Sequence, residues 1–69
     1  MIEIAVNGES RCVPEGLTVE SLLLHLGIDP SRVAVELNRR LVRKASWSQA
    51  RVEAGARVEV VQFVGGGSR

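Results

Sequence analysis

The alternation of apolar and polar residues predicts a β-hairpin at the start of the chain. Residues 1–6 place an isoleucine or valine at every second position, which is the period of a half-buried strand. Asn7 and Gly8 follow, and this dipeptide favours a type I′ turn because both central positions need a positive φ. Residues 9–13 should then return antiparallel and end at Pro14, which has no amide hydrogen to donate.

The apolar spacing becomes helical after this hairpin. Valine and leucine recur at i, i+3, i+4 and i+7 within residues 19–26, so they share one face of a helix. Thr18 is a suitable N-cap, but Ser21 stands where a capping box has Glu or Gln, so we expect an incomplete box. Gly27 can adopt the left-handed conformation that ends such a helix.

Three further strands are expected in the second half of the chain. Residues 33–38 alternate in hydrophobicity, residues 41–42 form a short strand after a turn, and residues 57–64 form the last strand. Residues 43–52 have no clean period and leave room for a turn of 3₁₀ helix. The order β-β-α-β-β-β predicts an α+β fold, with a mixed sheet and one main helix packed on one face.

The last strand changes its pattern partway. Val58 and Val60 alternate with polar residues, and then Val61 and Phe63 occupy the opposite face. We therefore expect either a β-bulge or burial on both faces. Burial on both faces would make this the central strand, and its natural partner would be the first strand, in parallel.

Composition restricts the class of protein. The chain has 69 residues, 45% hydrophobic and 25% charged, which indicates one small folded domain without a deep active site. A net charge of +1 creates no strong field for nucleic acid or membrane. No apolar run approaches the roughly 18 residues of a membrane helix, and no signal pattern precedes the domain, so we expect a cytoplasmic protein.

No side chain stands out as a catalyst or a metal ligand. Cys12 is the single cysteine and lies within a predicted strand, so we expect a buried structural thiol. His25 is the single histidine and should be solvated on the polar side of the helix. Since no other histidine and no cysteine lies at the spacing of metal ligands, we expect no metal site.

Two other features are interpreted as parts of the fold or its surface. Trp47 should cover one end of the core, whereas Leu24 points away from the apolar helix face and is a candidate partner contact. A basic group should be solvated, because nucleic-acid sites normally pair such charge with stacking aromatic residues. It comprises Arg39, Arg40, Arg43 and Lys44.

The end of the chain is the strongest candidate for chemistry. The last strand leads through Val64 directly into three glycines, so we expect a domain over residues 1–64 and a flexible tail over residues 65–69. Glycine places no side chain beside the acyl carbon, so such a tail can enter a narrow channel in a partner enzyme. An inert tag or linker is the alternative interpretation.

Four segments in this order resemble the ThiS family of sulfur carrier proteins. They are the Asn7-Gly8 hairpin and residues 17–23, 35–38 and 63–67, and the similarity runs over residues 1–67. The resemblance implies a ubiquitin-like β-grasp fold, in which the final strand is central and pairs with the first.

The resemblance also implies a mechanism. An E1-like adenylating enzyme uses MgATP to form an acyl-adenylate on Gly67, and sulfur from a cysteine persulfide then displaces AMP and leaves a thiocarboxylate. Thiazole synthase takes this sulfur for the thiazole ring of thiamine. Gly65 and Gly66 would be recognised as the tail, and Phe63 joins Leu24 as a candidate partner contact. The carrier would bind no cofactor and would not itself be an enzyme.

Other functions remain open at this stage. The same fold serves as the small subunit of molybdopterin synthase, as a carrier for cysteine biosynthesis, as a protein modifier and as a simple interaction module. The family normally ends at Gly-Gly, whereas Ser68 and Arg69 follow Gly67 here. We therefore expect these two residues to be trimmed, or to be foreign to the native chain.

Overall fold

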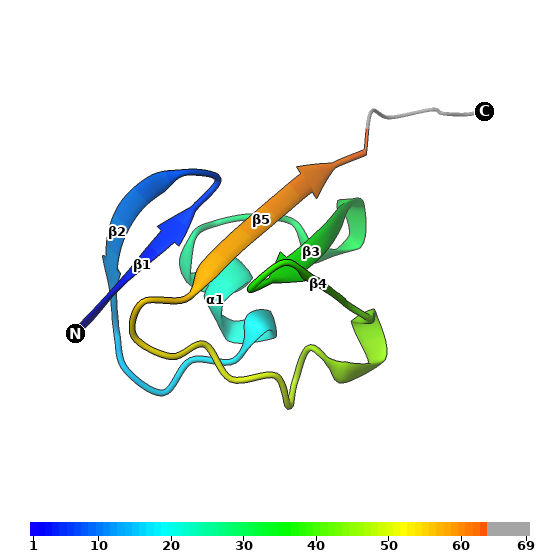
Figure 1. The fold of residues 1–69 in the computed structure, drawn as a ribbon. Coiled ribbons are helices and arrows are strands. Elements are labelled where there is room, and N and C mark those ends of the chain that lie inside the picture. Colours follow the sequence, from blue (N-terminus) through cyan, green and yellow to red (C-terminus); the bar gives the residue numbers. More distant parts are fainter. Residues whose placement is uncertain (64–69) are drawn as a thin grey trace.

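The computed structural model describes residues 1–63, so the tail expected at residues 65–69 lies outside the described residues. A mixed five-stranded sheet carries the helix α1 on one face (Figure 1), which confirms the predicted α+β class. The strands are β1 (Ile2–Val6), β2 (Glu9–Val13), β3 (Val33–Leu37), β4 (Arg40–Val42) and β5 (Arg57–Gln62), the helix is α1 (Val19–His25), and two 3₁₀ turns are η1 (Pro30–Arg32) and η2 (Lys44–Ser46).

The last strand lies in the middle of the sheet. The strand order is β2-β1-β5-β3-β4, so β5 separates the β1–β2 hairpin from the β3–β4 hairpin. The β1–β5 pair is parallel and the other neighbours are antiparallel. This confirms the expected central position of the last strand beside the first, which is the β-grasp arrangement.

The expected bulge or two-sided burial of β5 is wrong. The register with β3 runs without interruption from Val33↔Gln62 to Leu37↔Val58. Val58 is fully buried, whereas Val61 on the opposite face is 58% exposed. The strand is central because it lies between β1 and β3. Its second face stays exposed because α1 covers only the first face of the sheet.

The core is aliphatic and lies between α1 and the sheet. Trp47 adds the only aromatic ring among the buried residues of the described chain and is 3% exposed. Its indole Nε1 donates a hydrogen bond to the Val42 carbonyl at 2.9 Å, which ties the loop after η2 to β4. The predicted place of Trp47 against the core is therefore confirmed. The buried hydrophobic residues are Ile4, Val6, Val13, Val19, Leu22, Leu23, Val33, Val35, Trp47, Val52, Ala56 and Val58.

Both ends of α1 are capped by local hydrogen bonds. The Ser21 amide donates to Thr18 Oγ1 at 3.2 Å, and the Thr18 amide donates to Ser21 Oγ at 2.8 Å. The capping box is therefore complete, and the expectation of an incomplete one is wrong, because a serine hydroxyl also reaches the N-cap amide. At the other end Gly27 has φ +74°, and the Ile28 amide donates to the Leu23 carbonyl at 2.9 Å, as predicted.

Trp47 provides a test of this packing. Trp47→Phe leaves the Val42 carbonyl without its donor and removes buried volume, so it should lower the free energy of unfolding by about 1–3 kcal/mol. Urea unfolding followed by circular dichroism measures this change. The control Leu24→Ala alters an exposed side chain and should stay within about 0.5 kcal/mol of wild type. Equal stability of Trp47→Phe and wild type would contradict this packing.

Candidate functional site

The structure shows how the chain is held as it approaches the predicted reactive residues. Gly65, Gly66 and Gly67 themselves lie outside the described residues. The last described residue, Phe63, follows β5 directly, and its amide donates to the Arg32 carbonyl at 2.8 Å. The chain is therefore held beside β3 and η1 as far as Phe63, which lies four positions before Gly67.

We call Phe63 the root of the tail. Beside it, the face of the sheet that points away from α1 is exposed to solvent. Residues directly opposite in a register share one face, and the pair Ala34↔Val61 lies on the open side. Phe63 comes two positions after Val61 and continues the same row. Val61 and Phe63 are each 58% exposed, so apolar surface faces solvent here.

A third exposed apolar side chain belongs to this face. Leu41 pairs with Glu36 on β4 and is 67% exposed. Large apolar side chains gathered on one face at such exposure are typical of a partner interface. We call this group the outer-face patch. It comprises Ala34, Leu41, Val61 and Phe63.

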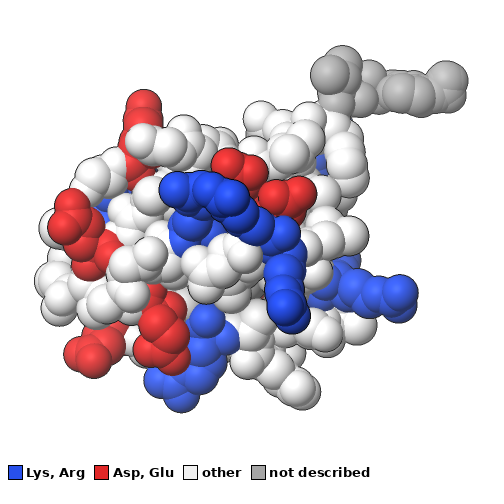
Figure 2. Space-filling view, in the orientation of Figure 1, with Lys and Arg blue, Asp and Glu red and all other residues white. Residues whose placement is uncertain are grey.

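Two carboxylates border the outer-face patch. Glu36 and Glu59 lie directly opposite each other on β3 and β5, an arrangement of like charges that disfavours strand pairing. Neither carboxylate forms an ion pair within residues 1–63. Acidic and basic side chains lie next to one another near the middle of the molecular face in Figure 2. Glu36 and Glu59 thus place negative charge at the border of the outer-face patch.

The two predicted partner contacts do not lie together. Leu24 is 63% exposed on α1, as its helical position predicts. Because α1 covers the opposite face of the sheet, Leu24 and Phe63 belong to different layers of the molecule (Figure 1). They cannot form a single contact surface.

Asp29 caps the 3₁₀ turn that holds the root of the tail. Its carboxylate accepts hydrogen bonds from the Ser31 amide at 3.0 Å and from the Ser31 hydroxyl at 2.8 Å. These bonds and the nearby Arg32 guanidinium hold the pKa of Asp29 below its ordinary value of 3.8. Asp29 is therefore ionised at neutral pH and stabilises η1, whose Arg32 carbonyl receives the Phe63 amide.

Other predicted side chains provide no catalytic group. The expectation of a buried Cys12 is wrong: the thiol is exposed, because it lies on the edge strand β2 and on the uncovered face opposite Glu3. His25 is exposed, as expected. No cluster of three or more metal-ligating side chains occurs in residues 1–63. The basic residues of the predicted group are all exposed, and Lys44 lies 5.5 Å from the centre of the Trp47 ring.

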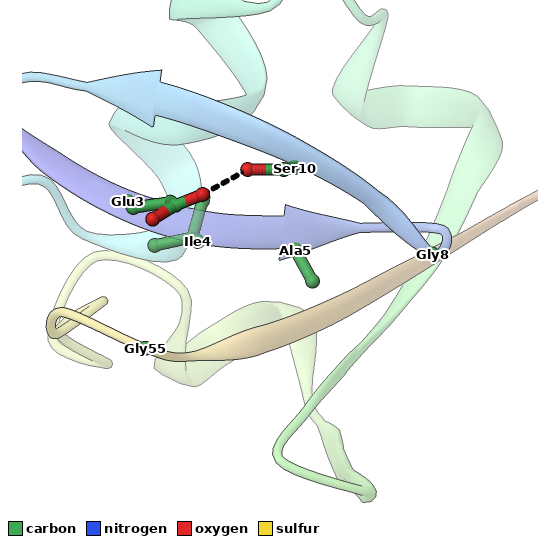
Figure 3. A pocket seen from close by; sticks show the side chains of 6 residues that line it. All are labelled: Glu3, Ile4, Ala5, Gly8, Ser10 and Gly55. Carbon is green, nitrogen blue, oxygen red and sulfur yellow. Dashed lines mark hydrogen bonds between the residues drawn. The ribbon is translucent and has the colours of Figure 1, made fainter.

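A shallow hollow lies where the first hairpin meets the start of β5 (Figure 3). Its volume is about 310 Å³. Glu3 is its one titratable side chain, and the Ser10 hydroxyl donates to that carboxylate. A carboxylate already bound to a hydroxyl, without a second acid or base, makes no acid–base pair. The remaining lining residues are Ile4, Ala5, Gly8 and Gly55.

The described residues therefore form a small folded domain with an exposed apolar face beside the end of β5. Within the described residues, no helix has the length and hydrophobicity needed to cross a membrane.

Comparison with known proteins agrees with this description. Residues 3–67 match the ThiS family, a range that includes both the described fold and the three glycines. The fold is similar to the crystal structure of the thiamine biosynthesis protein ThiS from Geobacter metallireducens, with a TM-score of 0.84 and 32% identity. That similarity covers 94% of this chain and 99% of the other.

Two longer relatives contain a similar segment. The thiazole synthase of Paramagnetospirillum magneticum is 45% identical over 67 residues, which cover 97% of this chain and 21% of that protein. The thiazole synthase of Magnetococcus marinus is 38% identical over 66 residues, or 96% of this chain and 20% of that protein. This chain thus spans about a fifth of the length of each. From the family match and the shared fold, the chain belongs to the ThiS family.

Proposed function

We propose that this chain is a sulfur carrier of thiamine biosynthesis and that Gly67 is its reactive residue. The observation that carries the proposal is the family match, which extends through Gly67. The central position of β5 supports it, because the strand that leads to the glycines is the middle strand of the sheet, between β1 and β3. Gly65 and Gly66 complete a segment without side chains that can enter a narrow active site.

The proposed chemistry starts from a carboxylate, which is a poor electrophile. An oxygen of the Gly67 carboxylate attacks the α-phosphorus of ATP, pyrophosphate leaves, and an acyl-adenylate forms. The terminal sulfur of a cysteine persulfide then attacks the acyl carbon and AMP leaves. A thiol cleaves the resulting acyl disulfide, and the thiocarboxylate remains on Gly67. Thiazole synthase then takes this sulfur for the thiazole ring.

The catalytic groups for these steps belong to partner proteins. We assign the binding of MgATP to an E1-like adenylating enzyme, the partner that membership of this family implies. The similar segments within two longer thiazole synthases support a sulfur acceptor that works beside the carrier. Because this chemistry consumes ATP, we assign it to the cytoplasm.

The outer-face patch is the surface we assign to the adenylating enzyme. Val61 of this patch lies on β5 and Phe63 directly follows that strand, so docking there positions the root of the tail at the same time. Glu36 and Glu59 would pair with basic groups of that enzyme, which relieves their mutual repulsion. Leu24, on the other layer, is a separate candidate contact.

The first test concerns the reactive atom. A chain ending at Gly67 carries a free carboxylate on that residue, whereas in the chain of 69 residues the Gly67 carbonyl is part of a peptide bond. Incubation with the cognate adenylating enzyme and MgATP should release pyrophosphate only with the chain ending at Gly67. Mass spectrometry should find AMP on that chain. Transfer of AMP to the untrimmed chain would contradict this assignment.

The second test compares the two layers of the molecule. Val61→Glu places a charge in the outer-face patch, and Leu24→Glu places the same charge at a similarly exposed position on α1. Desolvating an unpaired carboxylate in an interface is costly, so Val61→Glu should lower kcat/KM for adenylation by about tenfold or more. Leu24→Glu should stay within about twofold of wild type. Steady-state kinetics on chains ending at Gly67 measure both values, and the reverse order would move the docking surface to α1.

A further inference from the structure

β1 is too short to accompany β5 along its full length. Their parallel pairing has two registered partners, Ala5↔Arg57 and Val6↔Val58. The chain then turns away at Asn7, whose amide donates to the Val58 carbonyl at 2.9 Å. On the β1 side, no strand residue stands beside Val60 within the described chain.

The side chain of Asn7 occupies that position instead. Its Oδ1 accepts a hydrogen bond from the Val60 amide at 2.8 Å, and its Nδ2 donates to the Val60 carbonyl at 3.2 Å. A carboxamide offers one acceptor and one donor side by side, as a peptide group does. Asn7 therefore extends the ladder beyond the end of β1 and joins residues 53 positions apart.

The hydrogen bonds to Val60 restrict the side chain at position 7 more than the turn conformation does. Asn7 has φ +51°, a left-handed conformation that glycine adopts at least as easily. Glycine would thus satisfy the turn but could not bind Val60. The identity of the side chain matters for its hydrogen bonds to β5, and the turn alone does not require it.

β5 is consequently held on both edges close to the root of the tail, with Asn7 bound to Val60 on the β1 side. On its other side β3 contributes the pairs Val35↔Val60 and Ala34↔Val61. We infer that Asn7 is a positioning residue that fixes the direction in which β5 delivers the tail to the adenylating enzyme. This inference rests on the proposed function of Gly67.

Asn38 supplies a matched control within the same chain. It also has a positive φ, +52°, and also binds the backbone of β5. Its Oδ1 accepts from the Arg57 amide at 2.9 Å and its own amide donates to the Arg57 carbonyl at 2.7 Å. Asn38 thus holds the start of β5, whereas Asn7 holds the strand near its end. Replacement by glycine removes two side-chain hydrogen bonds to β5 at Asn7 and one at Asn38, and preserves the turn conformation in both cases.

The experiment uses chains that end at Gly67 and compares wild type, Asn7→Gly, Asn7→Asp and Asn38→Gly. Adenylation by the cognate enzyme gives kcat and KM, and hydrogen exchange reports the Val60 amide. Asn7→Gly should lower kcat by about tenfold, because a misdirected acyl group reacts slowly, and should leave KM within about twofold, because the outer-face patch is unchanged. Exchange at Val60 should become faster.

The other two variants distinguish positioning from general stability. Asn38→Gly should leave kcat near wild type, even though it also loosens β5. Asn7→Asp keeps an acceptor for the Val60 amide but loses the donor to the Val60 carbonyl, so its kcat should be intermediate. Circular dichroism at the assay temperature confirms that each variant is folded.

The outcomes separate this inference from the proposed function. An active wild type with equal kcat for Asn7→Gly and Asn38→Gly overturns the role of Asn7 and leaves the carrier function in place. Parallel loss of kcat and thermal stability in both glycine variants also overturns it. A wild-type chain that is not adenylated overturns the proposed function, and the role of Asn7 in that reaction with it.

Discussion

The pairing of β5 on both edges is the constraint on which the rest of the structure depends. β5 is the last strand in sequence but the middle strand of the sheet. Within the described sheet, the β1–β2 and β3–β4 hairpins therefore both pair with β5 and not with each other. Folding cannot be completed until this strand is inserted, because its contacts with β1 are distant in sequence. The residues that follow it therefore begin from the middle strand of the sheet.

The two faces of the sheet serve different purposes. One is covered by α1 and contains the aliphatic core, which supplies most of the stability that a domain of 69 residues can gather. The other face is not covered by a helix and carries the outer-face patch, which includes Phe63. A sheet covered by a helix on one side only leaves its second face exposed, and here that face carries apolar side chains of β3, β4 and β5.

Local patterns made much of this fold predictable, whereas features set by tertiary pairing were not. The first hairpin and α1 follow from periodicity and turn chemistry, whereas the central place of β5 beside β1 was implied by the family resemblance. The period of a strand does not reveal whether it is an edge strand, so Cys12 was expected to be buried although it is exposed. The bonds from Asn7 to Val60 depend on the relative lengths of β1 and β5, which sequence periodicity does not specify. The run of glycines itself pointed to this end of the chain, and the family resemblance narrowed the proposed reactive residue to Gly67.

The central claim is that Gly67 carries sulfur, and the mass of the protein isolated from its native host tests it most directly. The account predicts that, under thiamine starvation, a form ending at Gly67 carries one oxygen-to-sulfur replacement, located at that residue by fragmentation. Finding only unmodified protein under the same starvation would contradict it.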